Sequence, residues 1–464
     1  MIEKSELSRR DFLKLMSGAA AMSVLAACAP KAAEEPPAEE PVEEAPTEAP
    51  AEAPAEEAVQ LLLWSHWAEQ ENKKQTIIAV TDAYMEQNPN VEVEVVWWQK
   101  ADMWPAMQSA FTSGEGFPDM FYYDSGKLEF IEAGWIANLS TVGFDIDRLT
   151  PKGQVSWTYT GPDGEGVYCM AIEGGTDLIY INPDAFEEAG VAIPDDFFFT
   201  TDQFLDACLK IRASGKDPFC QGIGDRDYPG RYLYTFLTMS KLGAEGHQQL
   251  WSGEMSWDSP EAREILEYAD ELMQVPVNPA TYTTMTLAES HRYFHTEQRG
   301  AMFMVGSWYT GRAFVPPEEG GQPEDFRLSW IKYPLFSDGK GKNQIISQTG
   351  AGFAAAAMSP NLEYAIAWMN LFAQEEFSNL WLSNTGIPSD VKTNAATMPD
   401  TGIKWYFEEW ERVLGDADYQ LFKVDWCGEL VDAYKTVINE GLNQRLISVD
   451  EAIKQLEEAR KCGA

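Results

Sequence analysis

The chain of 464 residues carries 74 acidic and 34 basic side chains, which gives a formal net charge of −40. This charge argues against a nucleic-acid partner, because phosphate contacts need clustered lysine and arginine. The part of the chain after residue 58 is longer than the roughly 250–300 residues at which one hydrophobic core stops growing, so we expect two lobes.

Two export features occupy the N-terminus. Residues 8–14, Ser-Arg-Arg-Asp-Phe-Leu-Lys, resemble a twin-arginine signal. The apolar run from Met16 to Ala27 is too short to span a membrane and is typical of a signal peptide. Leu-Ala-Ala-Cys at residues 25–28 resembles a bacterial lipobox. This resemblance implies that residues 1–27 are removed and that Cys28 is lipid-modified with several acyl chains, since a single chain binds membranes only marginally.

The segment that follows, residues 28–58, is almost wholly Ala, Glu and Pro after its cysteine. Such a composition cannot bury enough apolar surface to fold, and its prolines and like charges extend the chain. We expect a disordered tether that holds a folded body away from the outer face of the cell membrane. No later apolar run reaches spanning length, so we expect no transmembrane segment after processing.

Elements of the body alternate between strands and helices. Strands are predicted at 61–64, 91–97 and 120–124, and helices at 76–87, 103–111 and 128–134. The first helix follows from apolar residues at Ile77, Val80 and Tyr84, and the second strand from the alternation of valine and glutamate over residues 91–95. Strands alternating with helices predict parallel βαβ units and an α/β fold.

One later stretch predicts a strand that is buried on both faces. Ala301 to Val305 form a short apolar run between Gly300 and Gly306, and Trp308 follows in a turn. The carboxyl end of such a strand faces the ligand crevice in open α/β sheets, so Trp308 is a candidate ligand platform. The alternative is a core tryptophan that caps the strand.

Several motifs, in this order, resemble those of the extracellular solute-binding proteins of bacterial importers, in the sugar-binding branch related to maltose-binding protein. They are Asn88-Pro-Asn90, Ser113-Gly-Glu-Gly-Phe-Pro-Asp119, Gly134-Trp-Ile-Ala-Asn-Leu139, Gly164-Glu-Gly-Val-Tyr168, Leu178 through Gly190, Phe294 through Trp308, Gly350-Ala-Gly-Phe353, Gly386-Ile-Pro388 and Val449-Asp-Glu-Ala452.

The resemblance implies a two-lobe periplasmic-binding-protein-like fold of type II. Each lobe would be a mostly parallel sheet flanked by helices, and hinge crossings would join the two. We expect residues 59–173 and 349–400 in lobe 1, and residues 174–348 and 401–464 in lobe 2. Four glycines at the crossings are candidate hinge residues, because glycine tolerates the backbone change that closure demands: Gly174, Gly175, Gly350 and Gly352.

A sugar site needs aromatic faces under the ring and polar groups around its edge. The candidate ligand-binding residues are aromatic or polar residues that lie at the predicted strand ends or where the resemblance implies ligand contacts. They are Trp64, Ser65, His66, Trp67, Tyr123, Asp124, Ser125, Thr176, Asp177, Arg231, Tyr232, Trp308 and Trp426. Trp97 and Trp98 are predicted to pack in the fold, and Asp119 is predicted to be a turn or cap residue.

The expected function is therefore a lipid-anchored, monomeric receptor. It would capture a mono- or oligosaccharide and deliver it to the permease subunits of an ABC transporter. Another solute, such as a glycerol phosphoester or a peptide, is the alternative within the class. A surface carbohydrate-active enzyme or lectin is the alternative outside it.

The sequence lacks the catalytic and metal-binding motifs that would indicate an enzyme. No Gly-x-Ser-x-Gly elbow occurs, and the helical pair His291 and His295 lacks the adjacent Glu of a metalloprotease. We therefore expect no enzymatic activity, no metal and no cofactor. The cysteines after Cys28 form no Cys-x-x-Cys pair, and a Cys208–Cys220 disulfide is left open. These five cysteines are Cys169, Cys208, Cys220, Cys427 and Cys462.

Overall fold

The structure is a computed structural model that describes residues 58–124, 127–394, 396–399, 401–415, 417–422 and 428–460. The export signal, Cys28 and most of the predicted tether lie outside these ranges, as do Ser125, Trp426, Cys427 and Cys462. Within the described ranges, no helix has both the length and the apolar character needed to cross a membrane.

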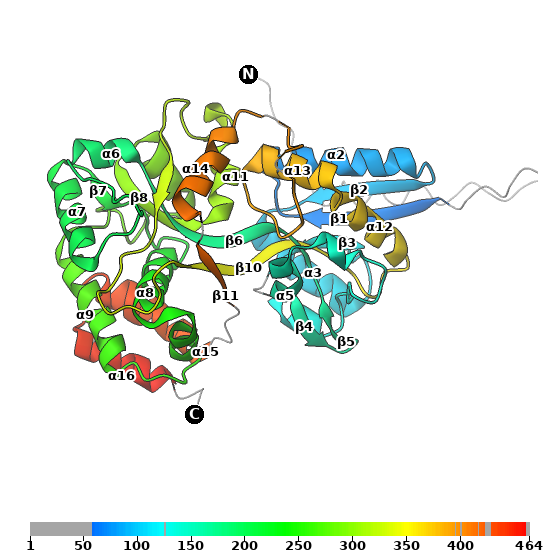
Figure 1. Cartoon of the computed structure of the whole chain (residues 1–464). Helices are drawn as coiled ribbons and strands as arrows, with labels where there is room; N and C mark the ends of the chain where they lie inside the picture. Colours follow the sequence, from blue (N-terminus) through cyan, green and yellow to red (C-terminus); the bar gives the residue numbers. More distant parts are fainter. Residues whose placement is uncertain are drawn as a thin grey trace, which may run out of the picture. The chain divides into compact units, whose positions relative to one another are not determined.

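A nine-stranded sheet is the framework of the body (Figure 1). Its path is β2-β1-β3-β10-β6-β8-β7, with β11 paired to β10 and β9 paired to β6. The strands are β1 (Val59–Ser65), β2 (Val91–Trp97), β3 (Met120–Tyr123), β6 (Met170–Ile181), β7 (Asp217–Phe219), β8 (Gly300–Gly306), β9 (Ser329–Ile331), β10 (Gln344–Ala355) and β11 (Asp418–Phe422). A separate hairpin joins β4 (Thr158–Gly161) and β5 (Gly164–Val167).

Parallel pairing occurs at both ends of this path. Strand β1 is parallel to β2 and β3, and β7 is parallel to β8. The two long strands in the middle, β6 and β10, are antiparallel to each other, and their register shifts between Gln348 and Gly352. Strand β10 also pairs with β3, whereas β6 pairs with β8, so these two strands connect the two groups of parallel strands.

A first hydrophobic core surrounds β1, β2 and β3. Its buried residues fall between Leu61 and Ile172 and between Phe353 and Val391. The predicted helix face is confirmed, because Ile77, Val80 and Tyr84 are buried. The helices of this part are α2 (Glu71–Gln87), α3 (Lys100–Ser113), α4 (Glu129–Glu132), η2 (Ile146–Arg148), α5 (Pro151–Ser156), α12 (Leu362–Phe372) and α13 (Glu375–Thr385).

A second hydrophobic core surrounds β7 and β8, with buried residues between Leu178 and Ile346 and between Tyr406 and Leu456. Every residue of β8 is buried, which confirms the prediction for this strand. Helices on this core include two π-helices, η3 and η6. The full set is α6 (Pro183–Glu188), α7 (Thr201–Ala213), α8 (Tyr228–Trp251), α9 (Pro260–Gln274), α10 (Leu287–His291), η3 (Arg292–Thr296), η4 (Ser307–Tyr309), α11 (Thr310–Ala313), η5 (Pro317–Glu319), α14 (Lys404–Leu414), α15 (Gly428–Ala433), η6 (Tyr434–Leu442) and α16 (Val449–Ala459).

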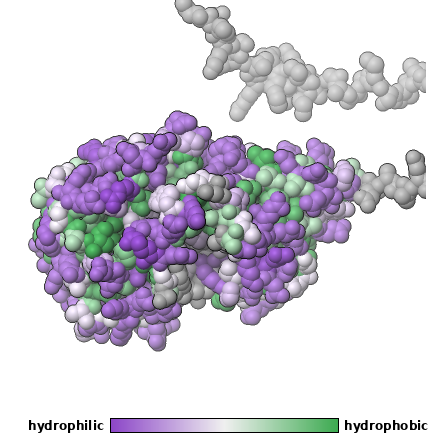
Figure 2. Space-filling model, turned by 45° about the horizontal axis from the view of Figure 1, so that its top comes forward, coloured by the Kyte–Doolittle hydropathy of each residue, from purple (hydrophilic) through white to green (hydrophobic). Residues whose placement is uncertain are grey.

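The fold class predicted from the sequence is confirmed as a mixed α/β fold with two cores. Strand β2 has the predicted bounds, whereas α2 begins earlier than predicted, at Glu71. Cys208 and Cys220 do not form the disulfide that the sequence left open. Both cysteines, like Cys169, are buried free thiols. On the face drawn in Figure 2, hydrophilic residues predominate and apolar ones gather in small patches.

Candidate functional site

Trp308 lies where the sequence predicts it, directly after β8 in the short helix η4. Its side chain is half-buried and packs against both hydrophobic cores. An added Cβ at Gly306 would come within 2.6 Å of the Trp308 indole nitrogen and 3.5 Å of the Tyr232 hydroxyl, so these two polar atoms lie against the same glycine. The Tyr228 ring is 6.0 Å from that of Trp308. Trp308 therefore belongs to an aromatic group with Tyr228 and Tyr232.

Arg231 adds a cation to this group. Its side chain is half-buried, and its guanidinium lies 5.9 Å from the centre of the Tyr232 ring. The carboxylate of Asp177, buried on β6, acts electrostatically on Arg231. Asp177 pairs in register with Gly306, at the end of β8. The structure thus brings together four of the predicted residues, Asp177, Arg231, Tyr232 and Trp308.

A second group of predicted residues lies at the carboxyl ends of β1 and β3. His66 is half-buried, and its ring is 4.0 Å from that of Tyr122. The Asp124 carboxylate forms an ion pair with the Lys100 ammonium at 2.8 Å. The same ammonium lies 5.3 Å from the centre of the Tyr122 ring. Because both strands are parallel, their following loops meet at one edge of the sheet.

Charge is concentrated around His66. Burial lowers the pKa of His66 well below its ordinary value, and the positive charges of Lys100, Lys73 and Arg312 lower it further. His66 is therefore a neutral imidazole at physiological pH. In that state one ring nitrogen donates and the other accepts a hydrogen bond.

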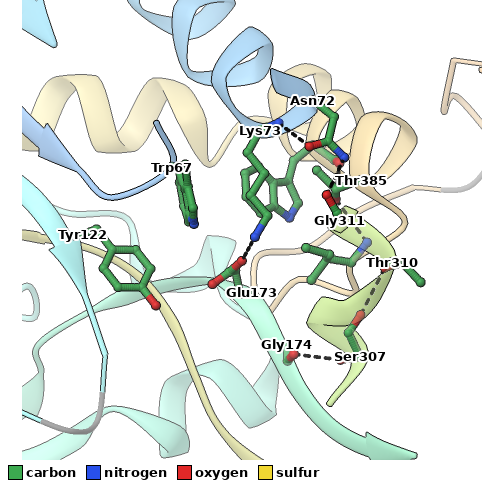
Figure 3. A network of polar contacts seen from close by, with 12 residues as sticks. Trp67, Asn72, Lys73, Tyr122, Glu173, Gly174, Ser307, Thr310, Gly311 and Thr385 are labelled. Atoms are coloured by element: carbon green, nitrogen blue, oxygen red, sulfur yellow. Dashed lines mark hydrogen bonds and ion pairs between the residues drawn. The ribbon is translucent and has the colours of Figure 1, made fainter. Parts of the chain in front are cut away.

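A buried ion pair lies beside this edge (Figure 3). The Lys73 ammonium contacts the Glu173 carboxylate, with side chains only 4% and 10% exposed. The same ammonium lies 5.1 Å from the centre of the Trp67 ring and 6.0 Å from that of Trp381. Burial lowers the pKa of Lys73, and the Glu173 carboxylate offsets part of that effect. This pair connects the first turn of α2 to the long strand β6.

Hydrogen bonds next to this pair reach the residues on either side of Trp308 (Figure 3). The Asn72 amide donates to the carbonyl of Gly311 in α11 at 3.0 Å. The Ser307 hydroxyl donates to the carbonyl of Gly174 on β6 at 2.7 Å. An added Cβ at Gly311 would lie 2.8 Å from Lys73 Cε, so α2 and α11 pack closely here. Helix α2 of the first core therefore contacts α11 of the second.

Arg312 is a residue of this region that the sequence did not single out. Its side chain is half-buried, and no hydrogen bond or ion pair joins it to another residue of the described ranges. Burial lowers the pKa of Arg312, while the carboxylates of Glu173 and Glu69 and the nearby Tyr228 raise it. Arg312 thus offers guanidinium donors close to residues of both cores. These donors can serve a ligand with hydroxyl or carboxylate oxygens.

Other predicted contact residues lie deeper. Trp67 and Tyr123 are fully buried, and the Tyr123 hydroxyl donates to the Lys127 carbonyl at 2.7 Å. Trp64 is 8% exposed and packs 4.7 Å from Trp98. Ser65 and Thr176 are also buried. The fold therefore encloses all five of these side chains.

Three of the four glycines at the crossings have a packing role. A Cβ at Gly174 would lie 2.4 Å from the Pro388 carbonyl oxygen, and one at Gly352 would lie 1.9 Å from that of Met170. No larger residue fits at these two positions while the backbone keeps its course. Gly350 likewise approaches the carbonyl of Glu173. These close approaches occur where β6 and β10 pass between the two cores.

Metal ligands do not converge among the described residues, in which no group of three or more His, Cys, Asp or Glu side chains has the required geometry. Of the pair His291 and His295, the second hydrogen-bonds to other parts of the fold. His295 bonds to the Tyr309 hydroxyl at 2.8 Å and to the Gly320 carbonyl at 2.9 Å, so both its ring nitrogens are occupied.

A separate cavity of about 930 Å³ lies on the second core, between α6, α14 and the segment after α11. Its arginines are already paired, Arg327 with Asp184 and Glu187, and Arg412 with Glu409. The cavity therefore offers few unused donors, and we assign no ligand to it.

A sequence profile for bacterial extracellular solute-binding proteins matches residues 67–377. An uncharacterised ABC transporter extracellular-binding protein of Pyrococcus horikoshii is 22% identical over 263 residues, which cover 55% of this chain. The matched part spans only 57% of the length of that relative.

Solved structures share the fold at low identity. A protein studied in connection with xylan utilization by Caldanaerobius polysaccharolyticus has a TM-score of 0.71 at 18% identity, covering 86% of this chain and 99% of its own. A chitin oligosaccharide binding protein has a TM-score of 0.69 at 16% identity, covering 87% and 98%. The solute-binding protein RafE of Streptococcus pneumoniae, in complex with raffinose, has a TM-score of 0.65 at 16% identity, covering 87% and 100%.

Proposed function

This chain belongs to the bacterial extracellular solute-binding proteins, and we propose on that premise that it captures a carbohydrate for an ABC importer. The proposed ligand is a mono- or oligosaccharide that is bound without being chemically changed. Three relatives by fold support this choice, because their names connect them with xylan, chitin oligosaccharide and raffinose.

The observation that carries the proposal is the pairing of Trp308 with Arg312 on one short segment after β8. A half-buried indole offers a flat apolar face to a sugar ring. A half-buried guanidinium without protein acceptors among the described residues offers donors to ring hydroxyls. Neutral His66 and the pair of Lys73 and Glu173 border the same region. This combination of aromatic face and unused donors suits a polyhydroxylated ring.

Closure of two lobes is the proposed mechanism. We assign the first core to lobe 1 (59–173 and 349–400) and the second core to lobe 2 (174–348 and 401–464). A ligand that contacts Trp308 and Arg231 in lobe 2 together with His66 in lobe 1 favours the closed state through its differential contacts. The crossings at Gly174, Gly175, Gly350 and Gly352 would absorb the backbone change.

Anchoring and delivery complete the proposal. The lipobox resemblance supports a lipid anchor at Cys28, with residues 28–58 as the tether. The loaded, monomeric receptor would hand its sugar to membrane permease subunits. Metabolic labelling of cells with a fatty-acid analogue tests the anchor. We expect the wild-type protein to carry the label and the Cys28→Ala variant to lack it.

A thermal-shift screen of the purified protein tests the ligand class. A sugar bound at a hundredfold excess over its Kd stabilises the native state by about 2.7 kcal/mol, so its melting temperature rises measurably. We expect a response to one member of a panel of xylo-oligosaccharides, chitin oligosaccharides, raffinose and maltose, with the sugar recovered unchanged. Release of a shorter product would identify an enzyme instead. A response only to a glycerol phosphoester or a peptide would identify another solute.

A further inference from the structure

The first turn of α8 carries Tyr228, Arg231 and Tyr232, yet it has no cap of its own. A helix begins with backbone N–H groups that lack partners within the helix, and the side chain of the preceding residue usually accepts one of them. The preceding residue here is Asp227, and its side chain makes no such bond. Pro229 has no N–H to satisfy. Gly230 is therefore the first residue of this turn after Tyr228 whose N–H needs an acceptor from elsewhere.

Asn439 supplies that acceptor from a different part of the chain. Its Oδ1 accepts the Gly230 N–H at 2.8 Å, and its Nδ2 donates to the Asp227 carbonyl at 3.1 Å. The side chain is only 2% exposed. An added Cβ at Gly230 would lie 2.4 Å from Oδ1, so glycine is required for this approach. One amide thus holds both sides of the start of α8.

The position of Asn439 is itself fixed by its surroundings. It lies in the π-helix η6, and such helices occur often at functional sites. The Tyr282 hydroxyl lies 3.4 Å from Asn439 Oδ1 and also 3.4 Å from the Nδ2 of Asn443, one turn further along. The Oδ1 of Asn443 accepts from Tyr234, deeper in α8, at 3.3 Å. Asn439 therefore hydrogen-bonds to the start of α8, near Trp308, whereas Asn443 hydrogen-bonds to Tyr234, further along α8.

We propose that Asn439 is a positioning residue of the ligand site, which holds Tyr228 and Arg231 in place beside Trp308 by capping α8 from another element. The inference rests on the proposed function, because the segment matters for affinity only if its side chains contact the ligand. A preorganised wall raises affinity by removing the cost of ordering that wall on binding.

Asn439→Asp separates positioning from general stability. The carboxylate still accepts from Gly230 but cannot donate to the Asp227 carbonyl, whereas the protonated carboxyl can. We expect the sugar affinity of the variant to fall about 10-fold relative to the wild type at pH 8. The ratio of the two affinities should return toward one at pH 5, as the buried carboxyl takes up a proton. Xylo-oligosaccharides, chitin oligosaccharides, raffinose and maltose are the probes, measured by titration calorimetry.

Asn443→Asp is the matched control, because it alters the same π-helix region without touching residues 227–230. We expect it to lower the melting temperature while its affinity ratio stays the same at both pH values. Equal affinity of Asn439→Asp and wild type at pH 8 would overturn the proposal. So would an equal, pH-dependent loss of affinity in the Asn443→Asp control.

Amide hydrogen exchange decides the structural part without any sugar. In Asn439→Ala the amides of Tyr228 and of residues 230–232 should exchange at least about 10-fold faster than in the wild type, while those of β1 and β3 stay unchanged. Unchanged exchange at Gly230 and Arg231 would refute the capping role. Failure of every probe to bind the wild type would refute the proposed function alone, because the exchange experiment still reports on Asn439.

Discussion

Breaking the buried ion pair tests the electrostatic account of this region most sharply. Lys73→Met keeps an apolar side chain of similar length and removes the ammonium that lies over the Trp67 ring and contacts Glu173. Both side chains are at least nine-tenths buried, so the remaining carboxylate has little water around it and has lost the ammonium that contacts it. Removal of one partner from such a pair costs about 3–5 kcal/mol. We expect a loss of that size in the free energy of unfolding, measured by urea denaturation at pH 7.

Two further variants make this test decisive. The double variant Lys73→Met/Glu173→Met replaces the pair by apolar groups and should recover most of the loss, because well-packed apolar replacements of buried pairs are often neutral or stabilising. Lys74→Met is the matched control. Its ion pair with Glu71 is 23% and 45% exposed on the two sides, and such pairs contribute only about 0–1 kcal/mol. Equal losses in Lys73→Met and Lys74→Met, or a double variant as unstable as the single one, would refute the reasoning.

Three more outcomes are expected. Arg312→Gln should weaken sugar binding by about 10–100-fold, the value of a hydrogen bond to a charged group, with an unchanged melting temperature; an unchanged Kd in calorimetry would remove Arg312 from the site. Gly311→Ala should lower the free energy of unfolding by about 1–3 kcal/mol, because the new methyl would lie 2.8 Å from Lys73 Cε and from Ile387 Cδ1; an unchanged urea midpoint would show that the two elements separate easily. Burial lowers the pKa of His247 to about 3, so between pH 6.5 and pH 3 the unfolded state binds a proton that the folded state does not. The free energy of unfolding should therefore decrease by about 1.4 kcal/mol for each unit by which the pH is lowered in this range. His247→Gln should lack this contribution in urea titrations, and an identical pH dependence in the variant would contradict the lowered pKa of His247.

Local patterns in the sequence were sufficient for the first strands and helices of the first core. Strand β2 alternates apolar and acidic residues, and α2 shows its buried face at Ile77, Val80 and Tyr84, so both follow from periodicity. The glycine that ends α3, Gly114, has a left-handed φ of 74°, which glycine adopts without strain. These features depend on neighbours in the sequence and need no knowledge of tertiary contacts.

The direction of side chains at the strand ends was harder to predict. Residues 120–123, Met-Phe-Tyr-Tyr, are all buried, so no alternation shows which tyrosine faces the polar network. The prediction named Tyr123, whose ring packs 5.0 Å from Trp157 in the core. Tyr122 is the one that lies beside His66. Only the register of β3 against β10 distinguishes the two.

Contacts between residues far apart in the sequence could not be predicted from local sequence patterns. Lys73 and Glu173 are far apart in the sequence, and each is an ordinary charged residue in its own segment. Arg312 lies beside the proposed site because the two short helices η4 and α11 follow β8, and the predicted turn at Trp308 did not indicate α11. The same holds for Asn439, which contacts α8 from the other end of the second core.

The central claim is that a sugar binds beside Trp308, and calorimetric titration of three proteins tests it directly. The proteins are the wild type, Trp308→Ala and Trp405→Ala. Trp405 is the matched control, 38% exposed on α14, where it lines the separate cavity. We predict one saturable site in the wild type, a loss of about 1–3 kcal/mol of binding free energy in Trp308→Ala, and no change in Trp405→Ala. Unaltered binding by Trp308→Ala, or weakened binding by Trp405→Ala, would contradict the claim.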